Sequence, residues 1–353
     1  MLGDLPHRTL SQLAQTYGPI MYLRLGLVPA IVVSSPEWAE LFLKTHDLVF
    51  ASRPNIMASQ YLSYGRKNMS FAPYGPYWRN IRKLCTLELL SNLKIEMFKP
   101  MRRKELLHYV ELIKSSAARR SAIDISAKVG SLIEDMTYQM LFGFKDDKFN
   151  LKSSMQEGLS RRMKDLSKII DGFLEKIIDE HVRDAKTLQG QHRDFIDVML
   201  SLMESNETHQ EHLDRDNTKA IMLDMLAAGM DTSTTVIDWT IAELLRHPRC
   251  LKLVQEELEN AVGLNRMVEE KDLPKLDYLK MVIKESMRLH PVAPLLIPRE
   301  SIEDITINGY FIPKKSRVLI NNWALGRDPN SWSSNAEEFY RKVYQYQHRC
   351  PRT

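Results

Sequence analysis

The sequence has few cysteines and little net charge. Its 353 residues include three cysteines, Cys85, Cys250 and Cys350, which lie far apart and form no CxxC pair. This spacing argues against a zinc site and a disulfide framework, and it favours a reducing, cytosol-facing compartment. The 49 basic and 45 acidic side chains leave a formal charge of only +4, so net charge gives no case for binding nucleic acid.

Long hydrophobic runs are also lacking near the N-terminus. No stretch there approaches the roughly 20 apolar residues of a membrane-spanning helix, and no signal segment precedes Leu5. We therefore expect the chain as given to be neither secreted nor membrane-spanning. With 14 glycines and 16 prolines the chain is not of a disordered or fibrous class, and its 44% hydrophobic residues are typical of a globular protein with a sizeable core.

Short β-type segments stand near both ends of the chain. Residues 20–25 and 30–34 are apolar and rich in β-branched side chains, which predicts a small hairpin. Residues 305–307 and 310–312 flank an Asn-Gly pair, and this pair accommodates the positive φ angles of a two-residue hairpin turn. Residues 317–321 predict one further strand.

The intervening sequence predicts helices from its three-to-four-residue apolar spacing. The longest begins near Thr218 and ends before Pro248, and it is apolar on most faces, as expected of a helix at the centre of a domain. No repeat, linker or low-complexity tract interrupts the pattern. One mixed helical domain with small sheets is the simplest prediction.

The centre of this long helix is weaker than its flanks. Residues 227–229 are Ala-Ala-Gly and residues 231–235 are Asp-Thr-Ser-Thr-Thr; Gly costs about 1 kcal/mol inside a helix, and Ser and Thr compete for backbone hydrogen bonds. One interpretation is a helix notched for close packing or bent by hydroxyls that bond back to carbonyls. The other is a groove beside a bound planar group, in which Asp231 and Thr232 deliver protons to bound dioxygen.

An ordered series of motifs follows downstream. Glu285 and Arg288 lie on one helical face and can pair, although an exposed pair of this kind contributes only about 0.3–0.5 kcal/mol. The pair is informative because other motifs follow it in a fixed order and at consistent spacings. These motifs are His290-Pro291, Pro298-Arg299-Glu300, the Asn308-Gly309 turn and residues 323–329, which read Trp-Ala-Leu-Gly-Arg-Asp-Pro.

An aromatic, proline-bounded loop leads into a basic helix upstream. Residues 71–79 read Phe-Ala-Pro-Tyr-Gly-Pro-Tyr-Trp-Arg, and residues 82–85 read Arg-Lys-Leu-Cys. On one interpretation this is an ordinary loop and amphipathic helix. On the other, the Trp78 indole N–H and the Arg82 guanidinium, one helical turn apart, hold the carboxylates of a haem.

Together these motifs resemble the cytochrome P450 family, in particular its plant microsomal members, over residues 1–340. The resemblance implies a mostly α fold with small β-sheets, the cytochrome P450 fold, incomplete at the C-terminus, and a non-family tail at residues 341–353. It implies pocket-lining roles for residues 63–72, 227–228 and 292–296. The implied site residues are Trp78, Arg82 and Arg299 on the haem propionates, Ala228 and Gly229 against the haem, Asp231 and Thr232 in oxygen activation, and Glu285 and Arg288 as a buried structural pair.

The resemblance also implies a reaction and its partners. Family members insert one oxygen atom of O2 into a small organic substrate, with haem (iron protoporphyrin IX) as cofactor and electrons from NADPH passed on by a flavoprotein reductase. The expected partners are this reductase, docked at the basic residues 79–83, and a small hydrophobic substrate; terpenoid, phenolic and fatty-acid substrates all remain open. The family's location is the endoplasmic reticulum membrane, cytosolic face. Because no anchor helix precedes Leu5, we expect this chain to be soluble or peripheral.

Besides the anchor, the sequence departs from the family at two places. The family's iron ligand is the cysteine of a Phe-x-x-Gly-x-Arg-x-Cys loop beyond residues 323–329, and Cys350 has no Phe or Gly at that spacing. We interpret residues from about Arg341 onward as out-of-frame translation, and Ser160-Arg161 as a junction that lacks a stretch of loop and helix. We therefore expect no metal ligand and little or no monooxygenase activity.

Two other functions remain open. An oxygen-independent haem-thiolate isomerase or dehydratase would not need Asp231 and Thr232, so the presence of this pair counts against it. A non-catalytic product of a degraded gene or misprocessed transcript is favoured by three separate departures in one chain.

Overall fold

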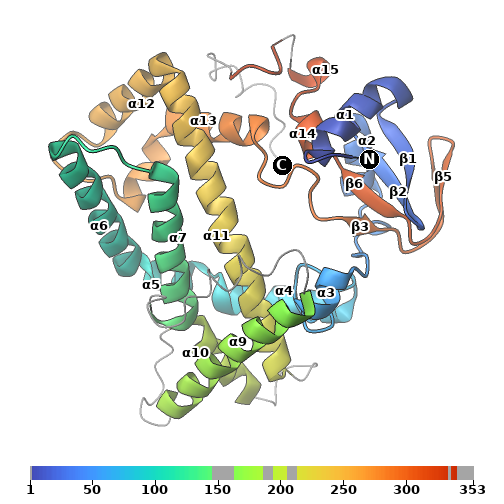
Figure 1. Ribbon diagram of the computed structural model, residues 1–353, viewed down its shortest axis with the longest axis horizontal. Coiled ribbons are helices and arrows are strands. Elements are labelled where there is room, and N and C mark those ends of the chain that lie inside the picture. The colour runs from blue at the N-terminus through green and yellow to red at the C-terminus, as the bar shows by residue number, and fades with distance from the viewer. Residues whose placement is uncertain (1, 145–162, 186–193, 205–212, 333–334, 340–353) are drawn as a thin grey trace. The chain divides into compact units, whose positions relative to one another are not determined.

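The computed structural model describes residues 2–144, 163–185, 194–204, 213–332 and 335–339. These residues are mostly helical with two small sheets, which confirms the predicted fold class (Figure 1). They form two compact units, and we call Ala51–Thr234 the middle unit and Met1–Phe50 with Thr235–Thr353 the terminal unit. The single domain over residues 1–340 stays a prediction. The predicted tail and the Ser160-Arg161 junction lie outside the described residues.

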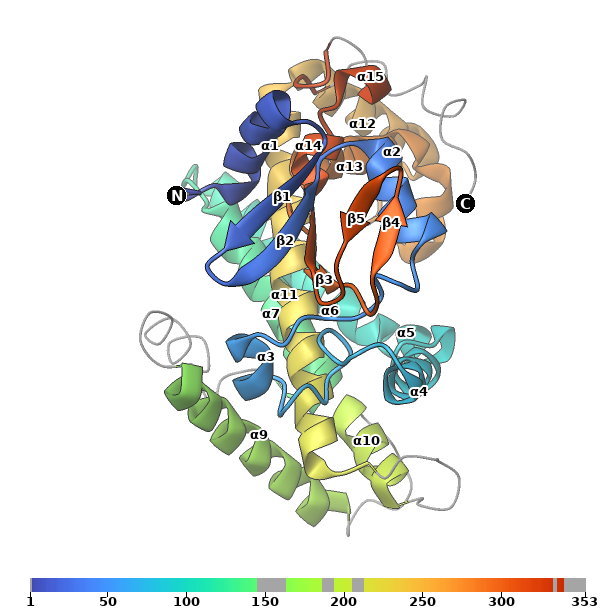
Figure 2. The ribbon, with the colours of Figure 1, turned by 90° about the vertical axis from the view of Figure 1, so that its right-hand side faces the viewer.

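The terminal unit contains a four-stranded sheet in the order β1-β2-β6-β3. The predicted hairpin is present as β1 (Ile20–Leu25) and β2 (Val28–Val33), which pair antiparallel (Figure 2). Strand β6 (Arg317–Ile320) runs parallel to β2, and β3 (Arg299–Glu300) pairs antiparallel with β6. Pro29 lies inside β2 rather than before it. It is tolerated because β6 pairs with β2 only from Ala30 onward, so no ladder donor is needed there.

The Asn-Gly hairpin has the predicted geometry. Strands β4 (Ile305–Ile307) and β5 (Tyr310–Ile312) pair antiparallel, and Asn308 and Gly309 have φ angles of 48° and 83°. The inward side chains Ile307 and Ile312 are buried with Phe42 and Phe50 in one hydrophobic core. A two-residue turn therefore fixes which face of this hairpin is buried.

Prolines begin several helices of the terminal unit, since the first turn of a helix does not need the missing N–H. Examples are α1 (Pro6–Tyr17), α2 (Pro36–Glu40) and α12 (Pro248–Ala261). A π-helical turn, Leu41–Thr45, continues α2. The remaining elements are the 3-10 helix Glu270–Lys275, α13 (Asp277–Leu289), α14 (Asn322–Leu325) and α15 (Pro329–Trp332).

The middle unit is built from helices around one large hydrophobic core. Most of its residues come from α4, α7, α9, α10 and α11, as expected when apolar stripes of several helices face one another. The helix α7 begins at the N-cap Asp124, whose side chain accepts the Ala127 N–H at 2.9 Å. The bounds are α3 (Met57–Tyr61), α4 (Pro76–Leu84) continued by the π-helical Cys85–Leu89, α5 (Asn92–Met97), α6 (Lys99–Ala118), α7 (Ile125–Phe142), α9 (Met163–Ala185) and α10 (Phe195–Glu204).

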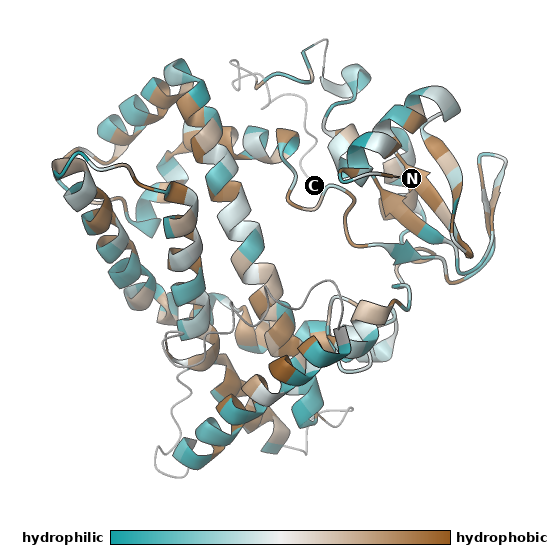
Figure 3. Cartoon of the chain, viewed as in Figure 1, coloured by the Kyte–Doolittle hydropathy of each residue, from teal (hydrophilic) through white to brown (hydrophobic). Residues whose placement is uncertain are grey.

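The long helix α11 (Arg215–Arg246) spans 32 residues and includes the boundary between the units. Its polar centre separates two more hydrophobic stretches (Figure 3). By length and composition alone it is the one described helix that could cross a membrane. A core helix has the same character, and Ile221, Met222 and Leu226 of α11 are buried in the core of the middle unit.

Candidate functional site

The predicted oxygen-activation pair lies on an exposed face of α11. Ala228, Asp231 and Thr232 are all exposed, and their spacing places them on one side of the helix. The Thr232 hydroxyl donates a hydrogen bond of 2.5 Å to the carbonyl of Ala228, one turn back. The polar centre of α11 therefore combines hydroxyl-to-carbonyl bonding with an open small-residue surface.

Gly229 of the same patch faces a different neighbour. A Cβ at this position would lie 3.7 Å from both Cγ2 and Oγ1 of Thr137 on α7. One Cβ at Gly130 of α7 would likewise lie 4.0 Å from Cγ2 of Thr234 on α11. These are ordinary van der Waals distances, so an alanine would fit at either position, and the contact between α7 and α11 does not by itself require glycine. The assignment of Gly229 to cofactor binding remains a prediction.

Trp78 and Arg82 lie together on α4, as their spacing predicts. The Arg82 guanidinium lies 5.3 Å from the centre of the Trp78 ring, and Arg82 is exposed. The Trp78 indole N–H, however, donates a 3.0 Å hydrogen bond to the carbonyl of Met69. One of the two predicted carboxylate donors is therefore accessible, while the other holds a neighbouring loop.

That loop carries residues that the sequence interpretation did not single out. Asp224 of α11 accepts hydrogen bonds from Asn68 Nδ2 at 2.7 Å, from the Met69 N–H at 2.8 Å and from the Ser70 N–H at 2.9 Å. Burial raises the pKa of Asp224, against the opposing effect of the Ser70, Asn68 and Met69 donors. This carboxylate ties residues 68–70, within the predicted pocket-lining segment, to the helix that carries Asp231 and Thr232.

Charged and hydroxyl groups tie the same segment to other helices. Lys67 Nζ lies 2.6 Å from Asp214 Oδ2; desolvation lowers the pKa of Lys67, but the hydrogen bonds and charges of Asp214 and Asp216 together raise it. The Tyr77 hydroxyl donates to the carbonyl of Lys67 at 2.6 Å and accepts from Asn217 Nδ2 at 2.7 Å. Lys219 is buried among the carboxylates of Asp171, Glu175 and Asp216 at 2.6, 2.8 and 3.2 Å.

Arg299, the third predicted propionate contact, belongs to the terminal unit. Its guanidinium lies 3.2 Å from Asp47 Oδ1 and donates to the carbonyl of Phe50 at 3.4 Å. Nearby, Leu296 in the predicted pocket-lining segment 292–296 has a φ of 52°, a left-handed conformation that is strained for a leucine. Arg299 and Leu296 both belong to the terminal unit, and their roles in cofactor binding and pocket lining remain predictions.

Glu285 and Arg288 form a buried, two-pronged ion pair on α13. The two N···O distances are 2.8 and 2.7 Å, and only 2% and 6% of the two side chains are exposed. Arg288 also donates to the carbonyls of Gly326, Ala336 and Glu338 at 2.5, 2.6 and 3.0 Å. The pair therefore contacts the irregular backbone after α14 at three carbonyls, and its assignment as a structural pair remains a prediction.

A second buried acid in the terminal unit was not anticipated. Glu243 of α11 lies 2.9 Å from His290 Nε2, and the ring of His290 stacks on Trp239 at 3.7 Å. Burial, opposed by Glu243, lowers the pKa of His290. Sequence analysis selected His290 for its motif, but its partner lies 47 residues away, which no local pattern reveals.

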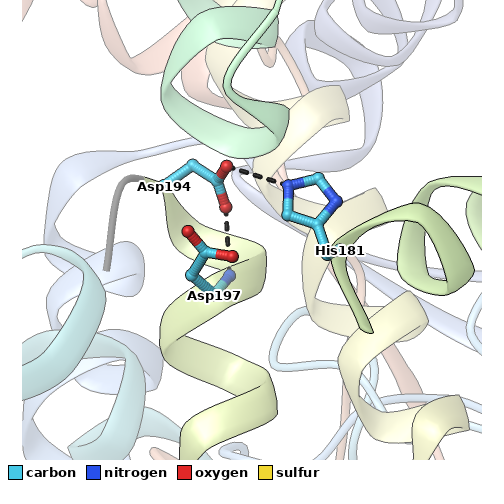
Figure 4. A group of neighbouring side chains, drawn as sticks. All are labelled: His181, Asp194 and Asp197. Carbon is cyan, nitrogen blue, oxygen red and sulfur yellow. Dashed lines mark hydrogen bonds and ion pairs between the residues drawn. The ribbon is translucent and has the colours of Figure 1, made fainter. Parts of the chain in front are cut away.

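A histidine and two aspartates of the middle unit have the composition of a metal centre (Figure 4). The ligand atoms of His181, Asp194 and Asp197 lie within 4.8 Å of one another. Asp194 nevertheless uses one oxygen for His181 Nε2 at 2.9 Å and the other for the Asp197 N–H at 3.0 Å, and His181 Nδ1 lies 2.8 Å from the carbonyl of Ile177. This is an ion pair that caps α10, and we assign no metal to it.

The described residues match part of what a haem would require. Arg82 is an exposed donor for a carboxylate, and the Ala228 face of α11 is open. The cysteines among the described residues, Cys85 and Cys250, are both buried, and burial raises the pKa of the Cys85 thiol to about 12. Arg82 and the Ala228 face therefore suit a haem carboxylate and the porphyrin ring, whereas neither described cysteine is placed to be the sulfur ligand of the iron.

Comparison with known proteins agrees with these features. The family model for cytochrome P450 matches residues 1–156 and 145–344. Cytochrome P450 CYP736A12 of Panax ginseng is 54% identical over 366 residues, covering 96% of this chain and 73% of that protein. Premnaspirodiene oxygenase of Hyoscyamus muticus is 38% identical, covering 96% and 72%. A zebra fish cytochrome P450 solved with abiraterone superposes with a TM-score of 0.82 at 30% identity, covering 96% of this chain and 82% of that one.

The matches extend over both units, and they include the motifs on α4, α11 and α13 as well as the β4–β5 hairpin. The resemblance inferred from those motifs is thereby confirmed, and the fold is that of the matched structures. The chain belongs to the cytochrome P450 family, whose enzymes are haem-dependent monooxygenases.

Proposed function

We propose that the site formed by this chain serves oxygen insertion into a small hydrophobic plant metabolite. The observation that carries the proposal is the exposed face of α11, where Ala228 leaves room beside Asp231 and Thr232. A premnaspirodiene oxygenase among the relatives supports a plant metabolite as substrate. When bound through a thiolate, haem supplies the oxygen chemistry, and the protein supplies position and protons.

Asp231 and Thr232 are proposed to move protons. The Thr232 hydroxyl already donates to Ala228 and keeps its oxygen lone pairs for a second partner. The adjacent Asp231 carboxylate is exposed to solvent, so it can take up a proton there. Arg82 and Arg299 are each proposed, from the family resemblance, as a contact for a cofactor carboxylate, and Glu285 and Arg288 would keep the backbone after α14 fixed.

The reductase and the membrane are proposed partners. Arg79, Arg82 and Lys83 are exposed on α4 and form a basic surface suited to an acidic electron donor. Association at such a surface should weaken as salt rises. The plant relatives support the endoplasmic reticulum membrane as the location.

We further propose that a polypeptide made of these 353 residues alone has little or no monooxygenase activity. It contains no Phe-x-x-Gly-x-Arg-x-Cys pattern, and Cys85 and Cys250 are buried in their respective units. The alternative of a non-catalytic gene product rests on the same observation. Without a thiolate, the residues on α11 have no reaction to serve.

Haem titration of the purified chain, followed by a reduced carbon monoxide difference spectrum, tests this proposal. We expect no thiolate-type Soret band. If one appears, the Cys85→Ser, Cys250→Ser and Cys350→Ser variants identify the ligand, and the proposed inactivity is wrong. Failure of the chain to take up haem at all would support the non-catalytic alternative.

A further inference from the structure

We infer that Asp224 is a positioning residue that sets one wall of the proposed substrate pocket. Asp224, Ala228 and Thr232 follow one another at intervals of four residues, so they lie along one side of α11. The carboxylate reaches from this side to Asn68, Met69 and Ser70. That this turn lines the pocket rests on the proposed function, whereas its attachment to α11 does not.

Three neutral donors converge on one carboxylate in this arrangement. Oδ2 accepts both backbone N–H groups, and Oδ1 accepts the Asn68 side-chain amide. Asn68 is buried, and its own Oδ1 accepts the Phe71 N–H at 3.0 Å, which closes the turn. The shape of residues 68–71 therefore depends on an acceptor supplied by a helix 156 residues further along the chain.

The backbone immediately before this turn is strained. Tyr64 and Arg66 have φ angles of 50° and 73°, in the left-handed region that non-glycine residues rarely adopt. Arg66 is held by bonds to the carbonyls of Arg53 and Phe71, at 2.6 and 3.0 Å. Strained conformations persist only where the surroundings fix them. Loss of the Asp224 contacts should therefore release the turn rather than leave it in place.

The Trp78 indole gives a local signal for this turn, because its N–H donates to the Met69 carbonyl. The Asp224→Asn substitution keeps the side-chain volume but must place an NH2 group against an N–H donor in either orientation. We expect amide hydrogen exchange at Met69 and Ser70 to accelerate about tenfold or more. We also expect the Trp78 indole resonance to shift while those of Trp38, Trp239, Trp323 and Trp332 stay unchanged.

A matched control and a reciprocal variant separate this role from general stability. Asp238→Asn makes the same change further along α11, at an acid whose Oδ1 is buried and has no hydrogen-bond partner within the described part of the chain. The double variant Asp224→Asn, Asn68→Asp exchanges the acceptor and donor, so the new amide can donate to position 68 and accept from Met69 and Ser70. We expect it to restore slow exchange and the Trp78 resonance.

Unchanged exchange at Met69 and Ser70 in folded Asp224→Asn protein would overturn the inference, as would equal acceleration in Asp238→Asn. If Asp224→Asn does not fold, the double variant decides: recovery of the fold and of slow exchange supports the inference, and failure of both counts against it. These measurements do not involve haem, so the outcome of the carbon monoxide spectrum leaves them standing.

Discussion

Each unit uses one charged side chain to hold a stretch of irregular backbone, but the two charges have opposite signs and different hydrogen-bond partners. Arg288 in the terminal unit donates to three carbonyls and is paired with the carboxylate of Glu285. Asp224 in the middle unit accepts from three donors, all of them neutral. The first charge is neutralised by an ion pair, and the second is stabilised by dipoles.

The difference predicts how each arrangement fails. Removing Arg288 leaves the Glu285 carboxylate buried without its cation, which is the costly way to break an ion pair. Removing the charge of Asp224 leaves only neutral groups without an acceptor, and the raised pKa of this acid shows that burial already works against its charge. Substitution of Arg288 should therefore lower the stability of the whole fold, whereas substitution of Asp224 should mainly loosen the turn at residues 68–71.

The largest effect is expected for Arg288→Ala, which should lower the free energy of unfolding by about 3–5 kcal/mol, as measured by urea denaturation. Arg288→Lys keeps the charge but not the planar fork, and should be intermediate. The double variant Glu285→Met, Arg288→Met should be less destabilised than Arg288→Ala, because no charge is left uncompensated. A loss below about 1 kcal/mol in Arg288→Ala would contradict the comparison.

His181 and Asp194 form a buried ion pair in which the histidine loses its positive charge as pH rises. Burial lowers the pKa of His181, but the hydrogen bond and charge of Asp194, with smaller contributions from the Ile177 carbonyl and Asp197, raise it above the ordinary value of 6.5. A pKa raised on folding gives stability that is fully present below 6.5 and is lost as pH rises through the folded-state pKa. The imidazolium alone satisfies both Asp194 and Ile177.

We therefore expect the urea midpoint to fall as pH rises from below 6.5 through the raised pKa of His181. The His181→Gln variant should lose about 1.5–3 kcal/mol at the low end of this range and show a flatter pH profile. Asp194→Asn keeps an acceptor for the α10 cap and should flatten the profile in the same way. A midpoint in the original chain that rises with pH over this window would show that the pair is not charged.

The contrast between the two units also marks what sequence can predict. Glu285 and Arg288 are three residues apart on a helix, so local geometry was enough to pair them. The contact from Asp224 to Asn68 joins residues 156 apart, and the partner could not be found from spacing. The sequence did indicate that Asp224 has a partner, because a carboxylate between Leu223 and Met225 on a core helix needs a polar group to contact.

Helices and hairpins were predictable because their patterns are local. The pairing of β2 with β6 was not, since it joins strands from opposite ends of the sequence. Trp78 shows the same limit at the site. Its residue type and its spacing from Arg82 were read correctly, but the loop that returns Met69 to its indole depends on tertiary packing. Motifs therefore selected the candidate residues, whereas a tertiary contact determines that the Trp78 N–H is already bonded.

The smallest effect is expected at an exposed pair, which isolates burial from charge. Glu40 and Lys44 lie 3.0 Å apart on successive helical turns, with 61% and 74% of their side chains exposed. Lys44→Ala should change the free energy of unfolding by less than about 0.5 kcal/mol, because solvent screens both charges before and after the substitution. Urea denaturation at low and high salt measures this directly. A cost near that of Arg288→Ala would mean that the number of ion pairs, rather than their burial, orders these effects, and the contrast between Arg288 and Asp224 would lose its physical basis.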